Sequence, residues 1–340
     1  MTIDANVYWL PRELFTDEHF REDFLRAVPR EYDVHARAER QDDGTWSFVI
    51  EKPKGCPNLD YFERDYEPER QMADMDAAGV EQALLKLPGC QEWLTLELCR
   101  RINDAMAERV RESGGRLAAL AVVPPYGDCQ CLQELDRCLE HLGMKGVQIS
   151  AHYGNHYLDD PMFRGFFRAV NDRQIPVYVH HTPVPVDCGA LLDYNNLRRS
   201  FGRCQDQITA IGRELFSGMF AELPNLIMVH SMLGGGYFAF KDMLMPRDSG
   251  NGRFDVNVDN VRQWLKNNIY FELSHAQPWS RQILKTAAKT LGADHIIYGS
   301  SYPVKKVWMT GGPEYVRSCG LSEAEQSLIL AGNAQRIYRL

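Results

Sequence analysis

The sequence lacks the long hydrophobic run that a membrane-spanning helix needs, and no apolar segment follows a basic stretch near its start. We therefore expect neither a membrane segment nor a signal peptide. Its nine cysteines include no pair with C-x-x-C spacing; Cys129 and Cys131 are the nearest pair. Scattered cysteines of this kind predict reduced thiols in a cytoplasmic protein.

Positive charge is also in short supply. Lys and Arg number 38 against 46 Asp and Glu, a formal net charge of -8. Such a balance offers no basic surface for nucleic acid or anionic lipid. The 44% hydrophobic content indicates a globular protein. We therefore predict a small-molecule substrate, with no nucleic-acid or membrane partner.

Two glycine-rich phosphate motifs are missing as well. The run Gly234–Gly236 is not followed by Lys and Ser or Thr, which excludes a P-loop. No glycine-rich dinucleotide turn follows the first predicted strand, so an open doubly wound sheet is the less favoured alternative.

Short β-branched runs alternate with longer amphipathic stretches, a pattern typical of βα units in a parallel sheet. We predict strands at 3–8, 82–87, 117–122, 145–150, 176–180, 226–230, 268–273 and 295–299. Predicted helices lie at 67–78, 94–113, 129–142, 160–173, 205–221, 258–266 and 279–291. Eight such strands predict a single (β/α)8 TIM-barrel domain over residues 1–340.

Two segments fall outside the barrel pattern. Residues 33–65, with a turn at Asp42–Gly44, predict a hairpin-like insertion after the first strand. Residues 231–257 are rich in glycine and predict a long loop after the sixth strand. Either segment is expected to cover the barrel mouth or to form a subunit contact.

Polar residues end several of these strands. In barrels of this kind, active-site groups project from the carboxyl ends of the strands, and residues two apart face the same way. Asn6 and Tyr8 therefore point together from the first strand. We expect them to converge on one mouth with the polar residues at the ends of strands two and five to eight, which are Lys86, His180, His230, Glu272 and Ser301.

Several motifs, taken in order, resemble the amidohydrolase-related barrel enzymes typified by aminocarboxymuconate semialdehyde decarboxylase and the resorcylate-type decarboxylases. The resemblance covers nearly the whole chain. The matching stretches are Asp74–Val80, Gly146–Ile149, Leu158–Phe163, Pro176–His180, Val229–His230 with Gly234–Gly236, Gly299–Pro303 and Gly332–Ala334.

The resemblance implies a divalent ion, usually zinc, held by His-x-His on strand one, a histidine ending strand five and an aspartate after strand eight. His180 matches the fifth-strand ligand, and His230 matches an assisting histidine on strand six. Asn6, Tyr8 and Ser301 replace the other ligands. Because zinc needs about three imidazole, thiolate or carboxylate ligands, we expect no metal and no cofactor. A rebuilt site is the alternative, drawn from His180, His181, His230, Glu272 and His275.

On this basis we predict a metal-independent lyase of the amidohydrolase superfamily that decarboxylates, or otherwise cleaves a C–C bond of, a small aromatic or cyclic carboxylic acid. The expected catalytic residues are His230, His180, Tyr8 and Glu272, with His230 or Tyr8 as proton donor. The expected substrate-binding residues are Asn6, Lys86, His275 and Ser301.

Two other functions stay open. One is hydrolysis of a lactone or amide by water that the imidazoles activate, and the other is a pseudoenzyme that binds a ligand without catalysis. The resemblance also implies a homodimer.

Overall fold

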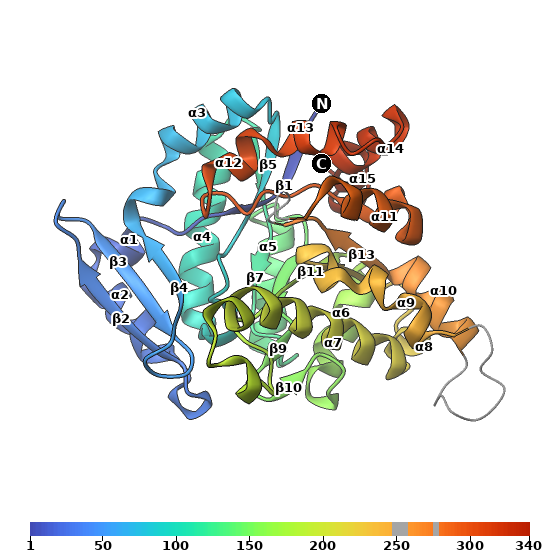
Figure 1. Ribbon diagram of the computed structural model, residues 1–340. Helices are drawn as coiled ribbons and strands as arrows, with labels where there is room; N and C mark the ends of the chain where they lie inside the picture. Colours follow the sequence, from blue (N-terminus) through green and yellow to red (C-terminus); the bar gives the residue numbers. More distant parts are fainter. Residues whose placement is uncertain (247–257, 275–278) are drawn as a thin grey trace.

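The computed structural model describes residues 1–246, 258–274 and 279–340. In this part of the chain, short parallel strands form a barrel with helices packed around its outside (Figure 1). The barrel strands are β1 (Ile3–Tyr8), β5 (Gln82–Lys86), β6 (Leu117–Ala119), β7 (Ala121–Val122), β8 (Val147–Ser150), β11 (Pro176–His180), β12 (Ile227–His230), β13 (Ile269–Glu272) and β14 (Ile296–Ile297).

The strands close into a ring. Their pairing order is β1-β5-β6 in one sheet and β7-β8-β11-β12-β13-β14 in the other. Only Leu120 separates β6 from β7, which joins the sheets on one side. On the other side, Val7 pairs with Tyr302, and the Ala5 amide donates to the Tyr298 carbonyl at 3.0 Å. The predicted barrel is therefore confirmed, with strand ends within two residues of those predicted.

Helices cover the outer faces of the strands. They are α1 (Glu13–Thr16), α2 (Glu18–Ala27), α3 (Pro68–Ala78), α4 (Leu96–Glu112), α5 (Cys129–Glu140), α6 (Arg164–Arg173), α7 (Gly202–Phe216), α8 (Met219–Glu222), α9 (Lys241–Leu244), α10 (Val258–Asn268), α11 (Arg281–Leu291), α12 (Lys306–Thr310), α13 (Gly312–Arg317), α14 (Glu323–Ser327) and α15 (Asn333–Tyr338). A π-helix, Leu197–Phe201, leads directly into α7.

Side chains alternate between the barrel interior and the helical shell, as a strand requires. Leu84, Tyr178, Val229 and Tyr270 form an interior cluster with Tyr338 of α15. Their strand neighbours pack in the separate cluster of the shell. The parity fixes where each strand end points: residues two beyond an interior residue face inward, and residues one beyond face the helices.

The first strand breaks this alternation. Ile3 and Ala5 belong to the interior cluster, and the pairing of β1 with β5 shifts between Asp4 and Val7. Such an irregularity re-aims the residues that follow it. Asn6 and Tyr8 consequently both point inward, although they lie one and three residues after the inward Ala5 and a regular strand would turn them outward.

A small antiparallel sheet lies beside the barrel, at the left of Figure 1. Its strands are β2 (His35–Arg40), β3 (Trp46–Glu51) and β4 (Pro57–Phe62), paired in that order. This is one strand more than the hairpin predicted within residues 33–65. A separate short hairpin pairs β9 (His152–Tyr153) with β10 (His156–Tyr157).

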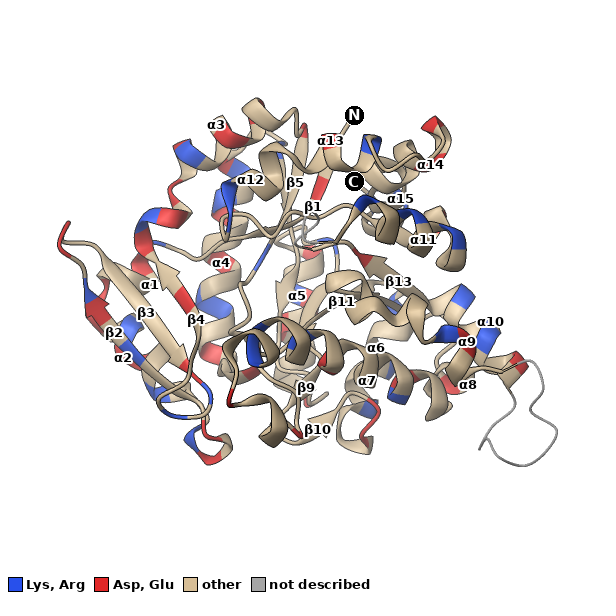
Figure 2. Cartoon of the chain, viewed as in Figure 1, with Lys and Arg blue, Asp and Glu red and all other residues tan. Residues whose placement is uncertain are grey.

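Basic and acidic residues, blue and red in Figure 2, alternate along the outer helices. None of the helices in the described ranges is long and apolar enough to cross a membrane.

Candidate active site

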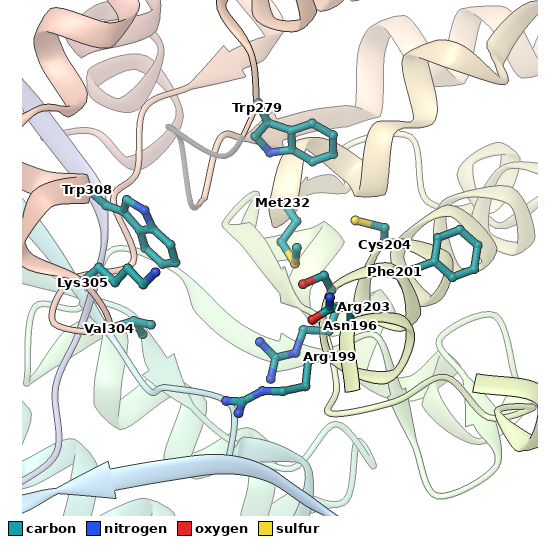
Figure 3. Close-up of a pocket in the computed structure, with 11 residues that line it drawn as sticks. Asn196, Arg199, Phe201, Arg203, Cys204, Met232, Trp279, Val304, Lys305 and Trp308 are labelled. Atoms are coloured by element: carbon teal, nitrogen blue, oxygen red, sulfur yellow. The ribbon is translucent and has the colours of Figure 1, made fainter. Parts of the chain in front are cut away.

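A cavity of about 610 Å³ opens where the barrel strands end (Figure 3). It continues into a recess of about 80 Å³, and the two share Arg199, Arg203 and Val304. Tyr8 and His180, the last residues of β1 and β11, line the recess. The ends of β1 and β11, the first and fifth barrel strands of the sequence prediction, therefore meet at one mouth, as the sequence predicts.

The small sheet and its continuation wall this recess. Leu59 and Tyr61 come from β4, and Tyr66 follows shortly after. Of the two roles expected for residues 33–65, the structure thus shows contact with the mouth. Much of the second segment, 247–257, lies outside the described residues.

Tyr8 and His180 form a hydrogen-bonded pair at the end of the recess. The Tyr8 hydroxyl lies 2.9 Å from His180 Nε2, and the rings meet edge to face at 5.5 Å. His180 Nδ1 lies 2.6 Å from the His181 carbonyl, which can only accept. The proton therefore sits on Nδ1, and Nε2 accepts from Tyr8.

Burial keeps both partners neutral. It lowers the pKa of His180 to about 3, with the charges of Arg203 and Lys86 acting in the same direction. Burial also raises the pKa of Tyr8 to about 12. The pair is consequently a phenol and an uncharged imidazole throughout the neutral pH range.

Two arginines reach the recess from the helical segment that follows β11, Arg199 from the π-helix and Arg203 from α7. Arg203 Nη2 donates to both oxygens of Asn58 at 3.0 Å, and no carboxylate in the described ranges forms an ion pair with it. Burial and the neighbouring Arg199 lower its pKa to about 10, which still leaves it charged at neutral pH. Arg199 contacts Asp60 at 3.5 Å. Arg203 is therefore a cation of the recess that no carboxylate among the described residues neutralises by an ion pair.

The walls of the larger cavity are mainly aromatic and apolar. Trp308 of α12, Trp279 just before α11 and Met232 just after β12 line it in Figure 3. A planar ring has large apolar faces to bury against such walls.

Asn6, Glu272 and Ser301 meet beneath the recess rather than in it. The Asn6 amide nitrogen donates to Glu272 at 3.0 Å and to Ser301 Oγ at 3.1 Å. Glu272 also accepts from the Tyr178 hydroxyl at 2.8 Å and from Ser274. All of them are fully buried and none lines the cavity. The three residues therefore come together in a buried network beneath the recess, and their predicted roles at the substrate stay predictions.

Lys86 is sealed in the same interior. Its ammonium lies 3.1 Å from the centre of the Tyr178 ring and donates no hydrogen bond to any residue that the structure describes. Burial lowers the pKa of Lys86 to about 7, against the opposing attraction of Glu272 and Asp4. The structure therefore places Lys86 in the barrel core, outside the lining of both cavities, and its predicted role in substrate binding stays a prediction.

His230 is also placed away from the cavity. Its ring nitrogens lie 2.9 Å from Gln207 and 2.8 Å from Glu214, both on α7. The residue before it, Val229, faces the barrel interior, so His230 faces the helical shell. Both ring nitrogens are thus engaged outside the mouth, and the predicted role of His230 as proton donor stays a prediction that this geometry does not favour.

The other two histidines have different outcomes. His181 lines the recess, stacked on His180 with ring centres 4.1 Å apart. His275, a predicted substrate contact, lies outside the described residues.

Sequence reasoning missed the basic and aromatic walls. Arg199 and Arg203 stand four apart, a spacing that places two side chains on one helix face. That signal was available, but a long irregular segment separates them from strand five. Trp308 and Lys305 follow the Gly299–Pro303 motif by a few residues and carry no spacing of their own.

Comparison with known proteins identifies the family. A family model described as Amidohydrolase matches residues 32–340. The chain belongs to this family. Among curated relatives, the amidohydrolase chain is 27% identical over 290 residues to a gamma-resorcylate decarboxylase of Rhizobium radiobacter, covering 78% of this chain and 85% of that protein. It is 27% identical over 243 residues to a 2-amino-3-carboxymuconate-6-semialdehyde decarboxylase of Dictyostelium discoideum, covering 70% and 66%.

Solved structures share the fold. A 5-carboxyvanillate decarboxylase of Novosphingobium aromaticivorans, with bound manganese, superposes with a TM-score of 0.78 at 21% identity, covering 100% of this chain and 97% of that one. A dihydroxybenzoic acid decarboxylase of Polaromonas sp. JS666, also with manganese, gives 0.76 at 20% identity, covering 100% and 97%. The predicted superfamily and its enzymatic character are confirmed by the family model and the curated decarboxylases, and the solved structures confirm the fold.

The manganese in those structures contradicts the prediction of no cofactor, which is wrong in this respect. The prediction judged the site by the ligands that zinc prefers. Manganese is suited by carboxylate, carbonyl and water oxygens, so the loss of imidazoles does not remove the case for a metal.

The described side chains nevertheless do not form a manganese site as they stand. No three His, Cys, Asp or Glu side chains among them gather in a group that could hold a metal ion. Both ring nitrogens of His180 are engaged, and the Glu272 oxygens accept from Asn6, Tyr178 and Ser274 beside a buried ammonium.

Proposed function

We propose that this amidohydrolase-family protein catalyses the non-oxidative decarboxylation of a small aromatic carboxylic acid. The observation that carries the proposal is the recess, where Arg203, a guanidinium without a carboxylate partner among the described residues, lines the same small space as the neutral Tyr8–His180 pair. A cation there can hold a carboxylate next to a phenol that can give up a proton. The curated relatives, gamma-resorcylate decarboxylases among them, support the same reaction class.

In the proposed reaction, the bond between a ring carbon and the carboxylate carbon breaks. The electron pair stays on the ring carbon, and the carboxylate leaves as CO₂. The ring carbon then takes the phenolic proton of Tyr8, and solvent returns a proton to the resulting phenolate. One carboxylate anion and one proton thus give one arene and one CO₂.

Tyr8 can serve as this acid because it is protonated at neutral pH. Before transfer, its hydroxyl must turn from His180 to the substrate, which forfeits a hydrogen bond worth about 1 kcal/mol. The positive charge of Arg203 lowers the pKa of Tyr8 against the larger effect of burial. Arg203 therefore orients the carboxylate first and stabilises the phenolate afterwards.

The test is to incubate the purified full-length protein with a panel of hydroxybenzoic acids in D₂O. Manganese chloride is included because the solved relatives carry manganese. We expect CO₂ release and an arene with deuterium at the vacated carbon. Hydrolysis of aryl lactones without any CO₂ release would move the protein to the hydrolase class, and binding without turnover would make it a pseudoenzyme.

We further propose that the protein is a cytoplasmic homodimer. Its resemblance to the decarboxylase family supports the dimer, and its unpaired, scattered cysteines support a reducing compartment. Light scattering of the purified protein would measure the mass of the assembly.

A further inference from the structure

The walls of the large cavity carry a charge opposite to that of the whole protein. The chain has a net charge of -8, yet the cavity is lined by three basic residues and by no acidic residue in the described ranges. These three are Arg199, Arg203 and Lys305. A local excess of one sign in a cleft concentrates ligands of the other sign.

The three cations are not equivalent. Arg199 is already partly neutralised by Asp60 at 3.5 Å. Arg203 sits at the boundary with the recess, where the reacting carboxylate is proposed to bind. Lys305 lines only the larger cavity.

Lys305 lies across the cavity from the arginines. Figure 3 shows it beside Val304 and Trp308 on one side, with Arg199 and Arg203 on the other. Its ammonium is 5.5 Å from the centre of the Trp308 ring, and no carboxylate in the described part of the chain forms an ion pair with it. Lys305 is therefore an exposed ammonium beside the aromatic wall, across the cavity from Arg203.

We propose that the preferred substrate carries a second acidic group, a carboxylate or an ionised phenol, which Lys305 binds while Arg203 holds the reacting carboxylate. This inference rests on the proposed function. A substrate with one carboxylate would use Arg203 and leave Lys305 without a partner. A planar diacid satisfies both cations with its ring against Trp308, which makes Lys305 a specificity-determining residue.

Binding of two unreactive probes tests the inference without turnover. The quenching of tryptophan fluorescence would report the affinity of the intact protein for benzoate and for isophthalate, which has a second carboxylate. We expect wild type to bind isophthalate roughly tenfold more tightly than benzoate. Lys305→Met should weaken isophthalate binding roughly three- to tenfold and leave benzoate binding unchanged.

Lys285→Met, which removes the same charge from α11 away from the cavity lining, is the matched control and should change neither affinity. An equal loss for both probes in Lys305→Met, or no preference for isophthalate in wild type, would overturn the inference. A Lys305-dependent preference without any CO₂ release would instead sustain it while the proposed decarboxylation fails.

Discussion

His180 and His230 end neighbouring parallel strands, but the barrel uses them in opposite ways. His180 follows the interior Tyr178 by two residues and points into the mouth, where it accepts from Tyr8. His230 follows the interior Val229 by one residue and points into the helical shell, between Gln207 and Glu214. A shift of one residue along the strand thus decides whether a histidine faces the mouth or packs against the helices.

Their chemical partners differ accordingly. His180 is held neutral by burial beside a neutral phenol and two cations, and its pKa is about 3. His230 lies 2.8 Å from the Glu214 carboxylate, and burial raises the pKa of Glu214 against the opposing effect of His230. The inward histidine is arranged for proton exchange with a neighbour, and the outward one for holding α7 on the barrel.

The largest expected effect is on the inward pair. Tyr8→Phe removes the phenolic proton but keeps the ring that packs against His180. General acid catalysis accelerates a reaction about 10²–10⁴-fold. We therefore expect kcat to fall by about 100-fold or more, with little change in KM. Steady-state kinetics with a substrate found in the panel above would measure both. An unchanged kcat would remove Tyr8 from the mechanism.

The second effect concerns the outward histidine. His230→Ala leaves Glu214 buried without its partner, which should cost about 3 kcal/mol of unfolding free energy. Urea unfolding would measure the loss. The kcat of the folded fraction should stay within about threefold of wild type because His230 does not line the cavity. A collapse of kcat with intact stability would return His230 to a catalytic role and erase the contrast with His180.

The third effect is a pH response specific to His180. In the unfolded chain this histidine takes a proton near its ordinary pKa of 6.5, whereas in the folded protein it does so only near 3. Between these values the unfolded state binds more protons, so stability is lost as the pH falls. From about pH 6.5 to about pH 5, His180 should cost about 2 kcal/mol.

Comparing His180→Gln with wild type isolates this response, because other buried groups titrate alike in both proteins. Urea unfolding at the two pH values should show a smaller acid loss in the variant. The exposed His19→Gln is the control and should follow wild type. Identical pH dependence in all three proteins would mean that His180 is not buried as a neutral imidazole.

The fold was accessible to sequence reasoning because each barrel strand is a short apolar run bounded by turns. Runs such as Pro176–His180 and Ile227–His230 mark both the strand and the end where a site must form. The inward position of His180 beside Tyr8 followed from these runs and from the parity of β1. That parity was correct although the pairing of β1 with β5 shifts between Asp4 and Val7, because Asn6 and Tyr8 both point inward despite the shift.

The misses have physical causes. Whether His230 faces in or out depends on where β12 begins its alternation, and an all-apolar run does not reveal that phase. Arg203 reaches the recess through a π-helix and the start of α7, whose path from strand five no local pattern specifies. The cofactor prediction failed because it judged the replaced ligand positions Asn6, Tyr8 and Ser301 by the ligand preference of zinc, whereas the solved relatives carry manganese.

The smallest expected effect comes from the partner of His230. Glu214→Gln removes the buried charge but keeps an oxygen that can accept from His230 Nε2, so we expect a loss of only about 1 kcal/mol. The loss of unfolding free energy in the double variant with His230→Ala should be smaller than the sum of the losses in the two single variants, because both substitutions remove the same interaction. Urea unfolding of the four proteins would give the coupling energy, about 1 kcal/mol or more for residues in direct contact. Strict additivity would show that the His230–Glu214 contact contributes nothing, and the outward histidine would then lack the structural role that distinguishes it from His180.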